Sequence, residues 1–213
     1  KIKLLDMIGF CKSLLLLVGL VYGTYTTDEV IAEQVTCPEL GLSFTLPDRF
    51  TALDSLQMDV LSKRGEKVVK ETFDTETMKG WQQVCFNLQD SLKRTILMSA
   101  ITVKEAVAQN GSVDKFMDKV FDDGNNLMIQ RLNNRVGVEL DETKVFKRDE
   151  ITIAGLKVKR NALNFVIGRQ QLFFARYYFF EKKDKLYFLV FFGSPRAKNN
   201  DEIATAIESG KAI

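Results

Sequence analysis

The residue types that most often carry chemistry are scarce in this 213-residue chain, and histidine is absent. Without histidine the chain lacks the commonest general base, the usual partner of a nucleophile and the commonest ligand of transition metals. Ser112 and Ser194 occur in the contexts GSV and GSP, which differ from the Gly-x-Ser-x-Gly turn of a nucleophilic serine. We interpret Ser112 as a helix cap and Ser194 as a turn residue.

Two pairs of adjacent carboxylates, Asp122-Asp123 and Asp149-Glu150, are the remaining candidates for acid–base or metal chemistry. Glycoside hydrolysis needs two carboxyl groups that face each other across a cleft, and neighbours within one segment do not do this. Residues 122–126 also lack the alternating ligands and the final glutamate of a calcium loop. We therefore interpret these residues as solvated acids, and we predict no enzyme, no metal and no cofactor.

The stretch FCKSLLLLVGLVYGTYTTDE, residues 10–29, predicts export. Its apolar core follows three lysines and has roughly half of the ~20 apolar residues that span a bilayer, as in a secretory signal. We predict a signal peptide over 1–23, cleaved between Gly23 and Thr24, and a polar tether over 24–36. A buried helix of the domain and an uncleaved membrane anchor are the alternatives. Contact with a membrane is therefore predicted only for this segment, as the signal or as an anchor.

Removal of residues 1–23 lowers Lys+Arg from 30 to 27 and Asp+Glu from 28 to 27, which leaves a net charge of zero. A neutral chain has no overall field that attracts nucleic acid, so no nucleic-acid partner is predicted. Two cysteines remain, Cys37 and Cys85. An even pair in an exported protein can form one disulfide, and two separate buried thiols are the alternative.

The remaining residues, 37–213, are predicted to form one domain. Alternating or continuous apolar runs predict strands, and apolar stripes at helical spacing predict helices. The short connections near 168–169 and 182–184 predict an antiparallel meander for the last three strands. Alternation along WQQVCFNL also places Trp81 and Cys85 on one face of their strand. The predicted strands are 40–46, which Pro47-Asp48 stops, 81–88, 94–103, 143–155, 156–168, 170–180 and 185–193, and the predicted helices are 54–73, 112–134 and 201–209.

Helices that interrupt an antiparallel sheet give an α+β fold, with a mostly antiparallel sheet flanked by helices on its faces. In the order of its elements the chain resembles the PsbP-like family. This family groups the extrinsic photosystem subunit with a Ran-GTPase nucleotide-release factor and many small exported bacterial proteins. The residues that carry the resemblance are LGLSFTLPDRF, VCFNLQDSLKRTILMSAI, TIAGLKVKRNAL and YFLVFFGSP followed by IATAIES, across about 38–210.

The resemblance implies an αβα sandwich and a non-enzymatic accessory or binding role. It transfers no partner, because the metal-linked and docking residues of the photosystem subunit have no matching positions here. The acidic Ran-facing surface of the release factor has none either.

Three functions follow, in order of preference. The first is an exported, non-catalytic protein that binds an envelope protein, which predicts an exposed apolar patch. The second is a carrier of a small hydrophobic or anionic ligand, held in a pocket between sheet and helices. Arg176 would anchor an anionic group there, and Trp81 is the other contact candidate. The third is an enzyme. A two-sided hydrophobic core is the simpler explanation of the aromatic strands around Arg176.

Overall fold

The computed structural model describes residues 34–47, 49–57, 80–136, 140, 145–167 and 170–213. It confirms the α+β class: a seven-stranded antiparallel sheet in the order β3-β4-β5-β9-β8-β7-β6 is accompanied by a three-stranded sheet in the order β1-β2-β10. The elements are β1 (Gln34–Cys37), β2 (Leu42–Thr45), β3 (Thr51–Ala52), β4 (Gln82–Gln89), β5 (Thr95–Thr102), α3 (Val103–Asn110), α4 (Val113–Val136), β6 (Phe146–Ile153), β7 (Leu156–Ile167), β8 (Gln170–Lys182), β9 (Lys185–Phe192), α6 (Asn200–Glu208) and β10 (Lys211–Ala212).

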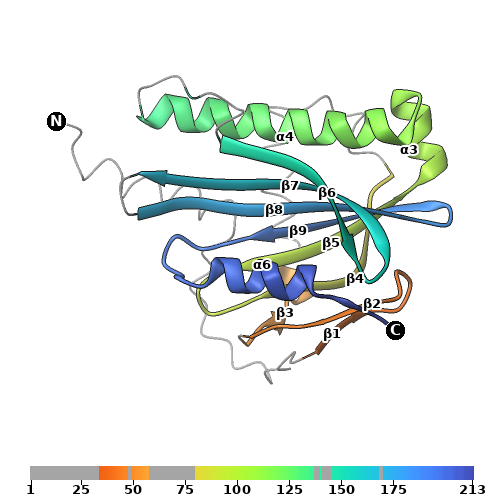
Figure 1. Cartoon of the computed structure of the whole chain (residues 1–213), viewed down its shortest axis with the longest axis horizontal. Helices are drawn as coiled ribbons and strands as arrows, with labels where there is room; N and C mark the ends of the chain where they lie inside the picture. The colour runs from red at the N-terminus through yellow and green to blue at the C-terminus, as the bar shows by residue number, and fades with distance from the viewer. Residues whose placement is uncertain (1–33, 48, 58–79, 137–139, 141–144, 168–169) are drawn as a thin grey trace.

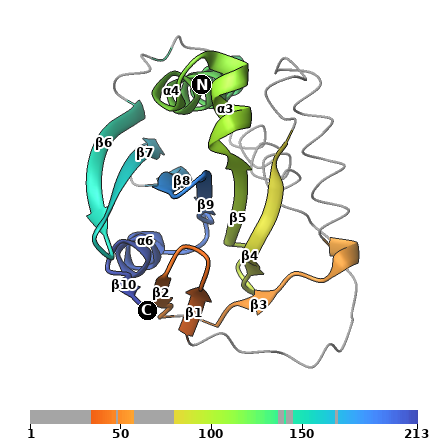
Figure 2. The same cartoon turned by 90° about the vertical axis from the view of Figure 1, so that its right-hand side faces the viewer.

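The large sheet is covered on both faces, as Figures 1 and 2 show. Helices α3 and α4 lie on one face, and α6 lies with the small sheet on the other. Alternate residues of β8 therefore enter different cores. Phe174, Tyr178 and Phe180 belong to the core on the α6 side, whereas Phe179 packs with Phe116 on the α4 side. The aromatic strands thus form the predicted two-sided core.

The predicted meander is confirmed, since β7, β8 and β9 pair antiparallel in sequence order. Two of the three predicted helices, over 112–134 and 201–209, are present as α4 and α6. Ser112 caps α4, because its hydroxyl accepts a hydrogen bond from the Lys115 amide at 3.2 Å. Ile203 and Ile207 anchor α6 and are fully buried. Apolar residues at helical spacing were sufficient for α4 and α6 because each packs one face against the sheet. Near-continuous apolar content was sufficient for the meander because its strands are buried on both faces.

The predicted helix over 54–73 lies mostly outside the described residues. Its beginning is described, and Asp54 acts as the expected cap: its carboxylate accepts a hydrogen bond from the Gln57 amide at 2.7 Å. The Gln57 side chain accepts from the Asp54 amide in return, at 2.9 Å. This reciprocal pair is a capping box.

Helix α3 was not predicted, because no element was assigned between the strand over 94–103 and the helix over 112–134. The structure ends the strand with a capping box in which the Thr102 hydroxyl accepts from the Glu105 amide. The signal was present in the sequence, since Thr102 and Glu105 have the Thr-x-x-Glu spacing. Strand β1 begins at Gln34, within the segment predicted as the tether, so residues 34–36 belong to the domain.

The prediction that Trp81 and Cys85 share a face was wrong. Pairing of β4 with β5 passes from Gln83 opposite Ser99 to Asn87 opposite Leu97, so β4 holds two extra residues. Cys85 lies in this bulge with φ 61°, a left-handed conformation that non-glycine residues rarely adopt. The bulge breaks the alternation and turns the side chain of Cys85 away from the face of Trp81.

Candidate functional site

Cys37 and Cys85 form a disulfide, with their Cα atoms 5.1 Å apart. Cys37 is fully buried at the end of β1, on the α6 side of the large sheet. Cys85 is exposed in the bulge of β4. The bond therefore attaches the small sheet to a strand near the border of the large sheet, and it settles the alternative of two separate thiols in favour of a bridge.

The two predicted contact residues lie on opposite faces of the large sheet. Trp81 is half-buried on the α4 side, where its ring stacks on Phe116 at 5.8 Å and contacts Phe188 at the same centroid distance. Arg176 projects from β8 toward α6, where it meets Asp201. The structure therefore does not combine Trp81 and Arg176 in one site, and the packing of Trp81 gives it a role in the core.

Arg176 is largely committed to the protein itself. Its guanidinium lies 4.0 Å from the ring centroid of Phe174 and donates hydrogen bonds to the carbonyl oxygens of Leu163 and Ala175 at 3.1 and 3.0 Å. The carboxylate of Asp201 is 3.4 Å away. Burial lowers the pKa of Arg176. The guanidinium that the carrier hypothesis assigned to an anionic ligand is therefore already bonded to groups of the protein.

A second charged cluster attaches the end of α6 to the sheet. Arg160 donates two hydrogen bonds to Asp149, at 2.8 and 2.6 Å, and forms an ion pair with Glu208 at 2.9 Å. The Tyr178 hydroxyl donates to Glu208 at 2.9 Å. The hydrogen bonds from Arg160 lower the pKa of Asp149, and burial raises the pKa of Tyr178 well above its ordinary value. Every member of this cluster has a partner, as expected of a structural network.

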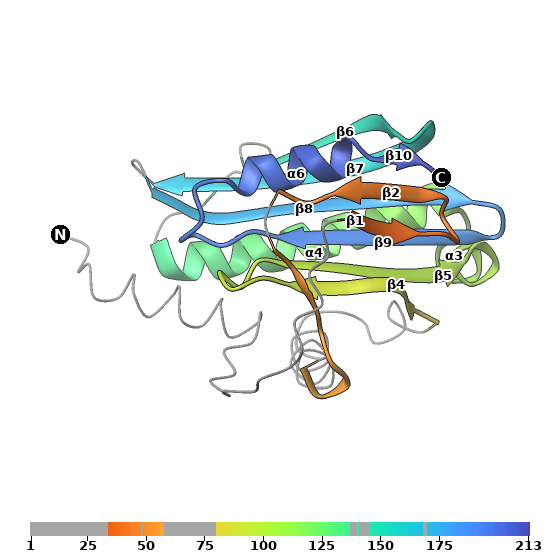
Figure 3. The same cartoon turned by 90° about the horizontal axis from the view of Figure 1, so that it is seen from below.

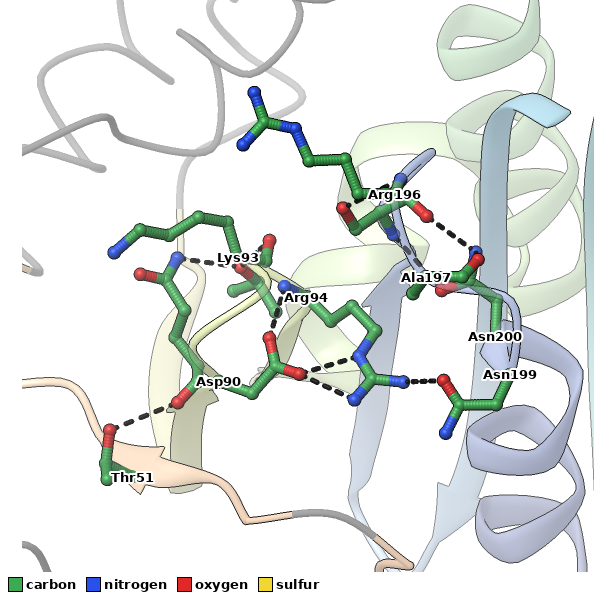
Figure 4. A network of polar contacts seen from close by, with 11 residues as sticks. Thr51, Asp90, Lys93, Arg94, Arg196, Ala197, Asn199 and Asn200 are labelled. Carbon is green, nitrogen blue, oxygen red and sulfur yellow. Dashed lines mark hydrogen bonds and ion pairs between the residues drawn. The ribbon is translucent and has the colours of Figure 1, made fainter. Parts of the chain in front are cut away.

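A third network, shown in Figure 4, joins the turn between β4 and β5 to the start of α6. The guanidinium of Arg94 is held by Asp90 at 2.7 and 2.6 Å and donates to Asn199 at 2.8 Å. Both members of the ion pair are buried. Asn200, also buried, donates to the carbonyl oxygen of Ser194 and accepts from the Ser194 amide. Ser194 is thus the predicted turn residue.

The remaining carboxylates of the sequence analysis lie apart. Asp122 pairs with Arg148, and Asp123 pairs with Lys119 at 2.8 Å. Asp149 and its neighbour Glu150 take successive positions in β6, which alternate between the two faces of a sheet. Within the described residues there is no group of three or more metal-ligating side chains. Among the same residues, no helix has the length and the apolar character that a bilayer crossing requires.

The candidate functional site is an open groove of about 430 Å³ between the end of β2 and the outer face of α6. Figure 3 shows these two elements side by side. We call it the α6 groove, and it is lined by Thr45, Leu46, Pro47, Asp201, Glu202, Thr205, Ala206 and Ser209.

Sequence reasoning missed the α6 groove. It treated DEIATAIES only as a closing helix, anchored by Ile203 and Ile207. The outer face of this helix carries small side chains and acids at 201, 202, 205, 206 and 209, and this was the signal available. The second wall comes from β2, which is more than 150 positions away in sequence.

No known family model matches the chain, and no curated protein matches it in sequence. Among solved structures, it is similar to the solution structure of cyanobacterial PsbP (CyanoP) from Synechocystis sp. PCC 6803, with a TM-score of 0.43 and 9% identity over 92% of this chain and 98% of the other. It is also similar to a crystal structure from Bacteroides thetaiotaomicron VPI-5482, with a TM-score of 0.38 and 8% identity. That match covers 85% of this chain and 48% of the other, about half its length.

Proposed function

We propose that the protein is an exported, non-catalytic binding domain that serves as an accessory to another envelope protein, and that the α6 groove is its contact surface. The observation that carries the proposal is the groove itself. Thr205, Ala206 and Pro47 are small, and Thr205 and Pro47 are exposed. Small side chains around a depression leave room for side chains of a partner.

The disulfide supports the proposal of export. Disulfides persist in oxidising compartments such as the bacterial periplasm and are rare in the cytosol. The bond between Cys37 and Cys85 therefore fits the predicted signal peptide. Intact mass spectrometry of the protein from the envelope of its own host tests this point. A chain that starts at Thr24 supports export with cleavage, and a full-length reduced chain from the cytosol contradicts it.

The state of the ionisable groups supports a non-catalytic role. Active sites keep groups with shifted pKa values available to substrate. Here the shifted carboxyl group, Asp149, is bound by Arg160, and Tyr178 is bound by Glu208 beneath α6. The carrier function has less support, because Arg176 already contacts Phe174 and two carbonyl groups.

Site-specific photo-crosslinking tests the contact surface. A photoreactive phenylalanine analogue replaces Thr205, in the groove, or Lys157, which is exposed on β7 outside it. We expect one discrete crosslinked protein from position 205 and none from 157. The identified protein is then purified, and it should co-elute with the wild-type chain but not with Ala206→Arg, which fills the groove. Equal crosslinking at both positions, or co-elution that Ala206→Arg does not change, would contradict the assignment.

A further inference from the structure

The charges of the α6 groove indicate which kind of partner it accepts. Its two ionisable residues are both acids, Asp201 and Glu202. Asp201 has an exposed side chain with one cationic neighbour, Arg176, whose nitrogen is 3.4 Å away. Within the described part of the chain Glu202 forms no ion pair, and it is exposed. Of the two carboxylates that line the groove, therefore, only Asp201 has a cationic partner among the described residues.

Acids in the first turn of a helix also favour the helix dipole, and both residues occupy the first turn of α6. That role explains why carboxylates are tolerated there. It does not explain why they border a depression whose other walls are small and partly apolar, with Leu46 buried beneath and Ala206 half-buried. The exposed hydroxyl-bearing residues Thr45 and Thr205 add acceptors beside the acids.

The segment of this chain that enters the small sheet next to the groove is an unsuitable occupant. Gln34, the first residue of β1, pairs with the groove residue Thr45. The ten residues before it, 24–33, contain three acids and no lysine or arginine. Like charges at close range repel, so an acidic segment gains nothing from this groove.

We propose that the α6 groove binds a lysine- or arginine-bearing segment of the partner protein, with the cationic group at Glu202 and Asp201 and a small apolar neighbour over Ala206. This inference rests on the proposed function, because it takes the groove as the contact surface. A cationic side chain fits because its N–H groups donate charge-assisted hydrogen bonds to the two carboxylates, which can only accept.

The experiment uses three capped heptapeptides with a central alanine. They differ only at the two positions around this alanine, which are both lysine, both glutamate or both serine. Each is titrated into the full ¹⁵N-labelled chain at low salt, and backbone amide shifts are followed. We expect the lysine peptide to shift the amides of Thr205, Ala206 and Ser209, and the glutamate and serine peptides to leave them unchanged. Raising the salt concentration to about 0.5 M should weaken the effect, because exposed charges are screened.

Charge variants separate recognition from helix stability. Glu202→Gln should weaken the lysine peptide roughly two- to fivefold, the size of one exposed charge pair, and the matched control Glu181→Gln should not. Glu202→Lys should reverse the preference toward the glutamate peptide, which a purely structural role of the acid does not predict.

Three results would overturn the inference. The first is equal binding of all three peptides, and the second is no change in the amide shifts of the groove residues. The third is a change in those shifts when residues 24–33 are deleted, because those residues would then be the occupant. The crosslink from position 205 to a partner can still appear in the first two cases. Failure of the charge inference is thereby distinguishable from failure of the proposed contact surface.

Discussion

The disulfide between Cys37 and Cys85 should supply a large share of the folding stability. The two cysteines are 48 positions apart. Loss of chain entropy in the unfolded state on closing such a loop corresponds to roughly 4 kcal/mol at 25 °C. Domains of this size are stable by only about 5–15 kcal/mol in total. Replacing both residues, Cys37→Ser with Cys85→Ser, is therefore a severe perturbation.

Local backbone strain reduces this estimate. Cys85 has φ 61° within the bulge of β4, and a left-handed conformation costs a non-glycine residue about 1–2 kcal/mol. Without the bond the bulge can relax and recover part of this cost. We therefore expect the double variant to lose roughly 2–4 kcal/mol of unfolding free energy.

Urea unfolding, followed by far-UV circular dichroism and by fluorescence of the single tryptophan, Trp81, measures the loss. A Cys11→Ser background removes the third cysteine and prevents exchange. The oxidised protein should have the higher midpoint, and the reduced protein should coincide with the double serine variant. The slope m should rise in the variant, because its unfolded chain is less compact.

Two outcomes would refute this reasoning. Coincident curves for the oxidised and reduced protein would mean that the bond does not constrain the unfolded chain. A reduced protein far less stable than the double serine variant would mean that the free thiols, of which Cys37 is buried, and not the lost crosslink, cause the destabilisation.

Three further predictions concern the polar networks. Arg94→Met leaves the buried carboxylate of Asp90 without its ion pair and should cost about 3–5 kcal/mol in urea unfolding; a loss below about 1 kcal/mol would show that the pair is not desolvated. Because Arg160 holds the pKa of Asp149 below its ordinary value of 3.8, this carboxylate stabilises the fold above that value and ceases to do so as the pH falls through the lowered pKa. Thermal unfolding between about pH 5 and pH 2 should therefore show a smaller loss for Arg160→Gln than for the wild type, and parallel profiles would contradict this. Tyr178→Phe removes the hydrogen bond to Glu208 under α6 and should lower the unfolding free energy by about 1 kcal/mol. The same thermal unfolding measures this loss, and an unchanged midpoint would contradict the prediction.

Local patterns determined much of the fold. The helices α4 and α6 follow from apolar residues at the spacing of one buried face, and this spacing is visible in the sequence. The strands of the meander follow from their apolar runs and the short connections between them. Ser112 and Asp54 also act as caps for a local reason, because a cap bonds an amide only a few positions away. The two-sided core was predictable from the near-continuous apolar content of the strands.

Long-range contacts decided the rest. The partner of β2 on one side is Lys211–Ala212 at the far end of the chain, and no local pattern specifies such a pairing. The same holds for the α6 groove, whose walls meet only when β2 and α6 pack together.

Cys85 shows where local reasoning fails for a physical reason. Alternation assumes a regular strand, and two extra residues in β4 change which face its side chain reaches. The sequence by itself determined that Cys37 and Cys85 were available for a bond. Only the tertiary structure decided that they meet, because a disulfide requires proximity that sequence spacing does not encode.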